Sequence, residues 1–312
     1  MNRDLERWLN WTWDNRATIM RLARESTHSE KHTHWYGYDA NRGIQEIYRY
    51  YNGSIGGQAT ENITAQDARN PDLNKFAANL ALAKLELGTV QVDVQRNAFV
   101  HNVSVSDLQN LTPDEIAGTF FHYRRRTIPT TKRVYLNLRP EGRGEAFRRI
   151  LAKIWTLHGL DTAKVSGPGA ADRVDTVVIY CQDQGSQESV VGELTDFNRE
   201  NRGLFRAPLP KLVRPVDGLV GIGCASEPPD VRLVRMKGKT YFQAGVSQSF
   251  GAYRSEIIFA ALEGSRTKSK MPESLRKRWF KEKALKLLRA GGVDPDNPAR
   301  QHRTHGGRIR FT

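Results

Sequence analysis

Cysteine is scarce in this sequence, since only Cys181 and Cys224 occur among its 312 residues. Two cysteines are too few for a disulfide framework or a cysteine-rich zinc site, so we expect both to be small buried residues. The sequence also lacks a run of about 18 or more apolar residues, which a membrane-spanning helix would need. Its first residues do not have the pattern of a secretory signal peptide, and we therefore expect a cytoplasmic protein.

Cofactor motifs are missing as well. Gly221 and Gly223 form a Gly-x-Gly that is not part of a dinucleotide-binding fingerprint, and the sequence contains neither a GKS/T phosphate-binding motif nor a kinase motif. His28, His32 and His34 lie close together, but their spacing is irregular and no other motif completes a metal site. We therefore expect no cofactor and no bound metal.

Positive charge is abundant, with a formal net charge of +14 and a sequence pI near 9.9. This balance favours an anionic partner, which could be nucleic acid, a phosphorylated substrate or an acidic peptide. Residues 263–312 are strongly basic and predict a helix at Pro272–Arg289 followed by a Gly/Pro/His/Arg tail. The segment could bind nucleic acid or a peptide, or it could be a solvated helix with a disordered tail.

Apolar residues recur at helical spacing in several segments, which comprise residues 1–24, 44–51, 76–87, 108–118, 188–198 and 250–262. The last segment has Ser247, Ser249 and Arg254 near its first turn, where free backbone N–H groups could bind a phosphate. An ordinary buried helix with a surface arginine would have the same pattern. Residues 202–230 are rich in proline and predict an irregular segment on the surface.

The stretch from residue 119 to residue 181 has the highest density of candidate functional side chains. Thr119–Arg126, Arg133–Leu138 and Val174–Tyr180 have the composition of strands, and Glu141–Leu157 is typical of an amphipathic helix. Order and length predict a β-β-α-β-β arrangement. The whole sequence therefore predicts an α+β fold, with a central, mostly antiparallel sheet, flanking helices and a helical N-terminal region.

The first of these strands carries an unusual set of polar side chains. Because successive side chains of a strand point to opposite faces, His122, Arg124 and Arg126 should share one face, while Tyr123 and Arg125 share the other. Guanidinium groups bind phosphate through a planar fork, and a histidine beside them can act as a general acid or base. This face suits an anionic ligand, although a solvated basic edge strand would have the same sequence.

Four blocks carry a resemblance to a known family: KRVYLNLRPEGRGEAFRRILAKI, KVSGPGAADRVDTVVIYC, GLVGIGCASEPPD and SFGAYRSEIIFAAL. Together they resemble the HopA-type effector family, which includes lyases of class V lanthipeptide and thioamitide pathways and is more distantly related to phosphothreonine lyases. The resemblance covers roughly residues 115–262 and implies a lyase-like α+β catalytic domain, which we place at residues 111–262. It does not explain the rest of the chain, where we expect a helical, peptide-binding region at residues 1–110 and a basic helix with a flexible tail at residues 263–312.

The resemblance also implies a reaction, the metal-free β-elimination of phosphate from phosphoserine or phosphothreonine to give dehydroalanine or dehydrobutyrine. By position, Lys164 matches the lysine that takes the α-proton, and His122 is the counterpart of the histidine that protonates the departing phosphate. The phosphothreonine lyases carry a Lys-x-His pair on that strand, whereas this chain has Phe120 in place of the lysine. Tyr123 is therefore a second candidate for the proton carrier.

Elimination needs residues of these types on chemical grounds too. The α-proton of a peptide is very weakly acidic, so its base should be a desolvated amine whose pKa neighbouring cations lower. General acid–base help is worth about 10²–10⁴-fold, and the leaving phosphate needs electrostatic stabilisation as well. The candidate phosphate ligands are Arg124, Arg126, Arg139, Arg173 and Arg254.

The sequence thus leads first to a phosphothreonine/phosphoserine lyase in the biosynthesis of peptide natural products. Its partners would be the leader and core of a phosphorylated precursor peptide and a separate kinase, with no membrane and no nucleic acid among them. The alternative is a non-catalytic, effector-like protein that binds a phosphopeptide or another partner.

Overall fold

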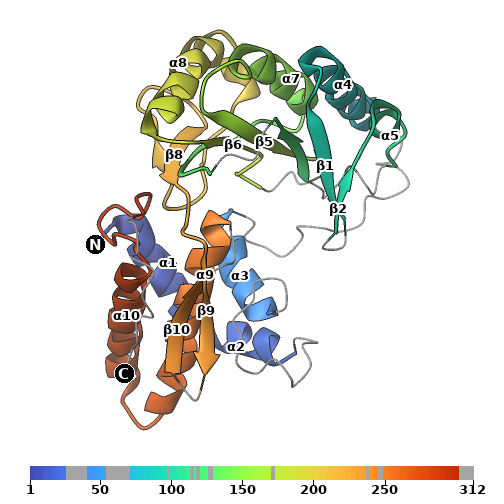
Figure 1. Cartoon of the computed structure of the whole chain (residues 1–312). Helices are drawn as coiled ribbons and strands as arrows, with labels where there is room; N and C mark the ends of the chain where they lie inside the picture. Colours follow the sequence, from blue (N-terminus) through green and yellow to red (C-terminus); the bar gives the residue numbers. More distant parts are fainter. Residues whose placement is uncertain are drawn as a thin grey trace. The chain divides into compact units, whose positions relative to one another are not determined.

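The chain folds into two compact units, shown in the computed structural model of Figure 1. One unit combines residues 1–55 with residues 226–312, and the other comprises residues 56–225. The structure describes residues 1–25, 41–53, 71–96, 99–112, 116, 120–125, 129–169, 173–236, 239–244 and 249–301. The unit boundaries do not coincide with the boundaries expected at residues 110 and 262, because the two ends of the chain pack against each other.

The unit of residues 1–55 and 226–312 is mainly helical. Its elements are α1 (Arg3–Asp14), α2 (Arg16–Arg24), α3 (Arg42–Tyr51), the antiparallel hairpin of β9 (Val231–Met236) and β10 (Lys239–Ala244), α9 (Phe250–Ser265), the short η4 (Arg266–Lys268) and α10 (Glu273–Ala290). Helix α9 is buried along almost its whole length, and α3 and α10 pack against it. The predicted N-terminal helices are confirmed, whereas the hairpin was not predicted.

The basic helix α10 packs against the N-terminal helix α1. The rings of Trp13 and Phe280 lie 5.7 Å apart between their centroids, and Lys277 forms an ion pair with Asp14 at 2.9 Å. The apolar stripes of both helices therefore bury each other, which the sequence could not indicate because they lie more than 250 residues apart. The predicted tail follows Arg289; the structure describes it as far as Gln301, with Val293 and Ala299 buried, and its remainder lies outside the described residues.

The unit of residues 56–225 is built on one sheet, with the strand order β2-β1-β3-β5-β6-β4-β8-β7. The strands are β1 (Gln91–Arg96), β2 (Phe99–Asn102), β3 (Phe120–Arg124), β4 (Lys132–Leu136), β5 (Leu160–Ser166), β6 (Val177–Cys181), β7 (Arg214–Pro215) and β8 (Ile222–Ser226). The pairs β1–β2, β1–β3, β3–β5, β5–β6, β4–β6 and β7–β8 are antiparallel. The predicted α+β fold with a mostly antiparallel sheet is confirmed.

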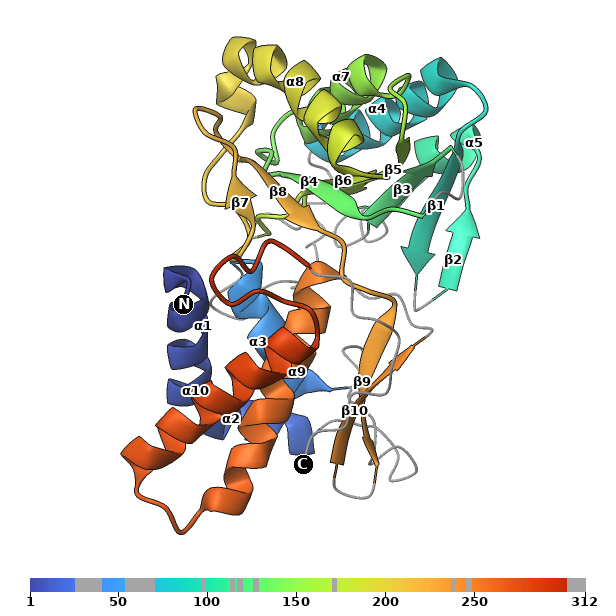
Figure 2. The ribbon, with the colours of Figure 1, turned by 60° about the vertical axis from the view of Figure 1, so that its left-hand side comes forward.

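Helices gather on one face of this sheet, as Figure 2 shows for α4 (Pro71–Leu87), α7 (Arg143–Ile154) and α8 (Gln184–Glu200). Two short helices, α5 (Val105–Gln109) and η3 (Arg202–Leu204), complete the unit. Residues 120–181 form the predicted β-β-α-β-β arrangement. The prediction of an irregular segment at residues 202–230 was wrong in part: Ile222–Ser226 has small residues but forms a fully buried strand.

The two cysteines lie in the core of this unit, as predicted. Burial raises the pKa of Cys181 to about 12 and that of Cys224 to about 11, so both thiols stay protonated and unreactive in the folded protein. In the described part of the chain, no helix is long and apolar enough to cross a bilayer.

Candidate functional site

The candidate site lies on the sheet face opposite to the helices, and strand register brings its central residues together. His122 of β3 is paired directly with Lys164 of β5, and on its other side with Asp93 of β1. Paired residues on antiparallel strands project from the same face, with Cβ atoms about 4.5–5.5 Å apart. A carboxylate, an imidazole and an amine therefore form one row across three adjacent strands.

The alternation within β3 separates this face from the core. His122 and Arg124 are partly exposed, whereas Phe121 and Tyr123 are fully buried. The rings of Phe121 and Phe76 of α4 lie 5.8 Å apart, and those of Tyr123 and Phe147 of α7 lie 5.3 Å apart. We call the side with His122, Lys164, Arg124 and Asp93 the polar face, and the helix-covered side the apolar face.

The prediction that Tyr123 is an alternative proton carrier does not agree with this placement. Its hydroxyl donates a hydrogen bond of 2.6 Å to the carbonyl of Leu80, inside the core. Burial raises the pKa of Tyr123 well above its usual value, so the phenol holds its proton more tightly. The correction follows from strand alternation, because a residue next to His122 in β3 must project from the opposite face.

Lys164 lies between two aromatic rings on the polar face. Its Nζ atom lies 4.4 Å from the centroid of the Phe120 ring and 5.9 Å from that of Tyr180. The guanidinium of Arg173 contacts the same Phe120 ring at 4.7 Å, and that of Arg133 lies over Tyr180 at 4.8 Å. These cation–π contacts fix the direction of the amine and bring three cations to one region of the sheet.

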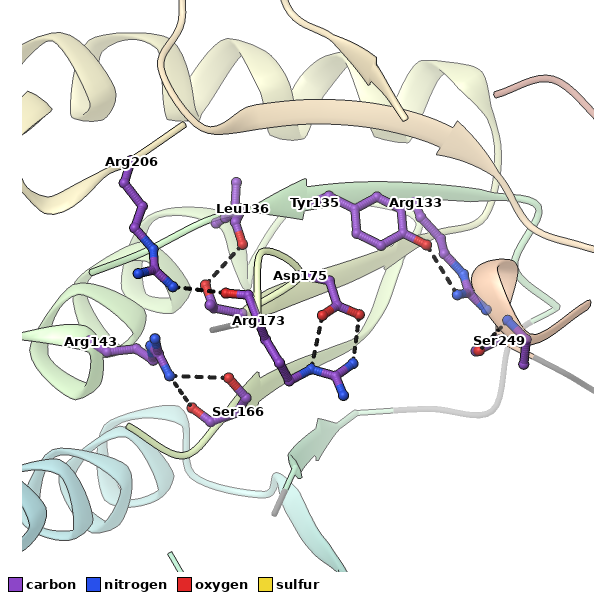
Figure 3. A network of polar contacts seen from close by, with 11 residues as sticks. Arg133, Tyr135, Leu136, Arg143, Ser166, Arg173, Asp175, Arg206 and Ser249 are labelled. Carbon is purple, nitrogen blue, oxygen red and sulfur yellow. Dashed lines mark hydrogen bonds and ion pairs between the residues drawn. The ribbon is translucent and has the colours of Figure 1, made fainter. Parts of the chain in front are cut away.

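Arg173 is anchored by a carboxylate. Its Nε and Nη2 atoms donate to the two oxygens of Asp175 at 2.9 and 2.8 Å, the bidentate geometry seen in Figure 3. Arg206, which follows the short helix η3, donates from Nη2 to the Arg173 carbonyl at 2.8 Å and from Nε to Asn137 at 2.9 Å. The main chain and the side chain of Arg173 are therefore both held in place.

A further arginine, Arg143, holds the end of the strand that carries Lys164. It lies at the start of α7, is 1% exposed, and donates to the carbonyl of Gly167 and to the carbonyl and hydroxyl of Ser166 (Figure 3). Burial, with a contribution from the nearby cations Arg206 and Arg173, lowers its pKa to about 9. Arg143 is thus a structural cation that stabilises the end of β5.

The surroundings of His122 on the polar face lower its pKa. Partial burial lowers the pKa of His122 to about 3, and the positive charges of Lys164 and Arg124 contribute to that shift. At neutral pH the imidazole is therefore uncharged.

The other predicted phosphate ligands have different positions. Arg124 lies beside His122 on the polar face, 3.5 Å from Asp93, and is 39% exposed. Arg139 follows β4; its backbone N–H donates to Leu204 and its side chain is exposed, so its role stays a prediction. Arg126 lies outside the described residues, as do His28, His32 and His34.

Arg254 lies in the other unit, where the structure gives it a packing role. It is fully buried in α9, stacks on the Phe250 ring at 3.5 Å and donates to the carbonyls of Phe250 and Pro298. The first turn of α9 is capped by Ser249, which accepts from the Ala252 N–H. The pattern that suggested a phosphate site belongs to a buried helix, as in the alternative interpretation, but the arginine is buried and not on the surface as that interpretation assumed.

Several residues of the site were not predicted as such, namely Asp93, Phe120, Arg133, Arg143, Tyr180 and Arg206. Their positions depend on strand pairing, and the register of β1 and β5 with β3 could not be known before the fold. Among the residues that the structure describes, no group of three or more His, Cys, Asp or Glu side chains could hold a metal ion.

Comparison with known families and structures finds a family match and similar folds. Residues 113–300 match the HopA1 effector protein family. An effector protein from Pseudomonas syringae pv. tomato strain DC3000 has a similar structure, with a TM-score of 0.57 and 16% identity, over 94% of this chain and 99% of that chain. An effector from P. syringae pv. syringae strain 61 has a TM-score of 0.51 and 12% identity, over 97% and 99%.

A more distant likeness covers 34% of this chain and 63% of the type III effector/phosphothreonine lyase OspF from Shigella flexneri, with a TM-score of 0.26 and 13% identity. A likeness at this level says nothing about the activity of this chain. No curated protein matches the sequence.

Proposed function

This chain belongs to the HopA1 effector protein family, and we propose that it is a lyase that removes phosphate from phosphothreonine or phosphoserine by β-elimination. The observation that carries the proposal is the direct pairing of Lys164 with His122 on the polar face, beside the guanidiniums of Arg124 and Arg173. A base, an acid and two phosphate ligands are the groups that this reaction requires.

In the proposed step, the neutral amine of Lys164 takes the proton from Cα of the phosphorylated residue. The electron pair of the C–H bond forms the Cα=Cβ double bond, and the bond from Cβ to the phosphate oxygen breaks. The phosphate leaves with that electron pair, and the His122 imidazolium supplies a proton to it. The products are dehydrobutyrine or dehydroalanine in the peptide and inorganic phosphate, so atoms and charge balance without a cofactor.

The cations around the row would hold the phosphate between the two groups. Arg124 flanks His122 on the same strand, and Arg173 contacts the same Phe120 ring as Lys164. Guanidinium groups bind phosphate through paired donors and carry charge at any relevant pH. The anchoring of Arg173 by Asp175 favours a preorganised ligand, because less side-chain entropy is lost on binding.

The state of His122 fits an acid that is charged only in the complex. With a pKa of about 3 it is neutral before the substrate binds. Burial is the main cause of this low pKa, and the charges of Lys164 and Arg124 contribute to it. A phosphate dianion placed between the two cations would offset their contribution and thereby raise the pKa of the imidazole.

The resemblance of the sequence to lyases of lanthipeptide and thioamitide pathways supports a substrate of the same class. We infer that the substrate is a ribosomal precursor peptide, phosphorylated by a separate kinase and recognised through its leader as well as its core. The net charge of +14 is compatible with an acidic, phosphorylated partner.

A second candidate is a non-catalytic protein that binds a phosphopeptide or another partner. The neutral state of His122 favours it, because a histidine with a pKa of about 3 is a poor acid unless the ligand changes that value. In this case the polar face would bind phosphate through Arg124 and Arg173 without turnover.

The deciding experiment is mass spectrometry of a phosphothreonine-containing peptide after incubation with the purified protein in the presence of a chelator. We expect the wild-type protein to release phosphoric acid and Lys164→Ala to lose at least about 10²-fold in rate, since it lacks the base. Lys153→Ala, which removes an exposed lysine of α7, is the matched control and should keep full activity.

The binding of the same peptide separates the two candidates. The wild-type protein should be tested with a range of leader-bearing phosphopeptides. If it binds them but releases phosphate from none, the result would support the second candidate, a non-catalytic binding protein. Equal elimination by wild type and Lys164→Ala would exclude Lys164 as the base.

A further inference from the structure

Asp93 is a buried carboxylate with no role in the proposed reaction so far. It lies in the middle of β1, is 2% exposed, and is paired with His122 across the β1–β3 ladder. Asp93, His122 and Lys164 thus stand side by side on the polar face, with the imidazole between the carboxylate and the amine. Burying a carboxylate is unfavourable unless cations or donors compensate it, so its position calls for a physical reason.

The contacts of Asp93 leave one of its oxygens available. Oδ1 accepts a hydrogen bond of 2.7 Å from the Gln91 side chain. Oδ2 is buried without a hydrogen bond, and it forms an ion pair with Nη2 of Arg124 at 3.5 Å, beyond good hydrogen-bond geometry. The carboxylate is therefore held on one side by Gln91, while its second oxygen lies toward Arg124, on the strand that carries His122.

We propose that Asp93 is the positioning residue of His122: it accepts a hydrogen bond from one imidazole nitrogen and directs the other nitrogen toward the leaving phosphate. Cross-strand neighbours are close enough for this contact, since their Cβ atoms lie about 4.5–5.5 Å apart. A carboxylate in this place selects the tautomer of the neutral ring and stabilises the imidazolium when it forms. This role rests on the proposed lyase function.

Arg124 connects this contact to substrate binding. Arg124 forms an ion pair with Asp93 at 3.5 Å, and its charge adds to the effect of burial in lowering the pKa of His122. A phosphate dianion competes for the same guanidinium. When Arg124 turns to the phosphate, the Asp93 carboxylate becomes available to the imidazole, so phosphate binding and protonation of His122 are coupled. The charged groups described on this part of the face are Asp93, Arg124 and Lys164, and the guanidiniums of Arg173 and Arg133 contact the neighbouring rings of Phe120 and Tyr180.

The kinetic test uses Asp93→Asn in the full chain, with the phosphothreonine peptide as substrate. We expect kcat to fall by about 10-fold to 100-fold, a part of the ~10²–10⁴-fold that acid–base catalysis provides, with no rise in KM. Asp161→Asn is the control, because Asp161 is a buried carboxylate of β5 that is not in register with His122. It should leave kcat and KM unchanged.

A binding test does not require turnover. NMR of ¹⁵N-labelled histidine, with the His122 signal assigned from His122→Asn, follows the pKa of His122 with and without inorganic sulfate, a dianion over the whole range. We expect sulfate to raise this pKa by about 2 units or more in the wild-type protein, and by at least about 1 unit less in Asp93→Asn.

The outcomes separate this inference from the proposed function. If the wild-type protein eliminates phosphate and Asp93→Asn does so with the same kcat and the same pH profile, the positioning role is wrong while the lyase stands. If no protein eliminates phosphate, the lyase proposal fails, and the sulfate-induced shift still decides whether Asp93 acts on His122. An identical shift in wild type and Asp93→Asn overturns the inference.

Discussion

The two faces of the sheet in residues 56–225 use the same strands for opposite purposes. On the apolar face Phe121 and Tyr123 are fully buried, and they stabilise the unit by packing against α4 and α7. On the polar face the intervening His122 and Arg124 stand among cations and a buried carboxylate. Neighbouring residues of one strand therefore carry either the stability or the chemistry, and substitutions can separate the two.

The largest effect is expected on the apolar face, for Phe121→Ala. Removing a fully buried ring leaves a cavity, so this variant should lose about 3–5 kcal/mol of stability in this unit. Cys181 and Cys224 are the only cysteines and both lie buried here, so thiol labelling during urea unfolding reports on this unit alone. At low temperature the folded variant should still eliminate phosphate. A variant that lost activity but kept its stability would contradict the division of stability and chemistry between the two faces.

The second prediction concerns the pH dependence that His122 gives to stability. Its pKa is about 3 in the folded protein and about 6.5 in an unfolded chain, so between these values the unfolded state binds more protons. Stability is therefore full above about pH 6.5 and falls as the pH drops toward 3. From about pH 7 to about pH 5 His122 alone should cost at most about 2 kcal/mol.

His122→Asn should remove the part of the pH dependence of stability that protonation of His122 causes. Thiol labelling with a pyridyl disulfide, which reacts in mild acid, can compare the two proteins at both pH values. An equally steep loss of stability in His122→Asn would mean that His122 is already charged in the folded protein.

The smallest effect is expected for Tyr123→Phe. The variant loses the hydrogen bond from the phenol to Leu80, worth about 1 kcal/mol, and keeps the ring contact with Phe147. Its elimination rate should equal that of the wild-type protein, because the hydroxyl lies on the apolar face. A rate reduced by a factor of about ten or more would restore Tyr123 as a proton carrier.

Local patterns predicted much of this unit correctly. The alternation of β3 separated His122 and Arg124 from Tyr123, since side-chain direction in a strand has a period of two whatever the strand pairs with. The amphipathic spacing of Arg143–Ile154 predicted α7 for the same reason. The strand Ile222–Ser226 was missed because IGCAS has little β-branched content, and burial between neighbours decides its structure instead.

The site was predicted only in part, and the missing residues have a common feature. Asp93 and Tyr180 come from segments that precede or follow β3 by more than 20 residues, and only strand pairing brings them to His122 and Lys164. The sequence pattern of its segment predicted Arg254 as a phosphate ligand. In the structure its guanidinium instead donates hydrogen bonds to the carbonyls of Phe250 and Pro298. The sequence shows that an arginine is present, but it does not show which hydrogen-bond acceptors its guanidinium contacts in the folded protein.

By itself the sequence determined which side chains of each strand and helix share a face, because backbone geometry fixes these periods locally. It also determined the strongly positive charge and the small number of cysteines. Only the tertiary structure decided which strands lie next to each other, in which register, and that the two ends of the chain form one unit. These features depend on contacts between distant segments, whose free energy is set by the burial of complementary surfaces rather than by any local pattern.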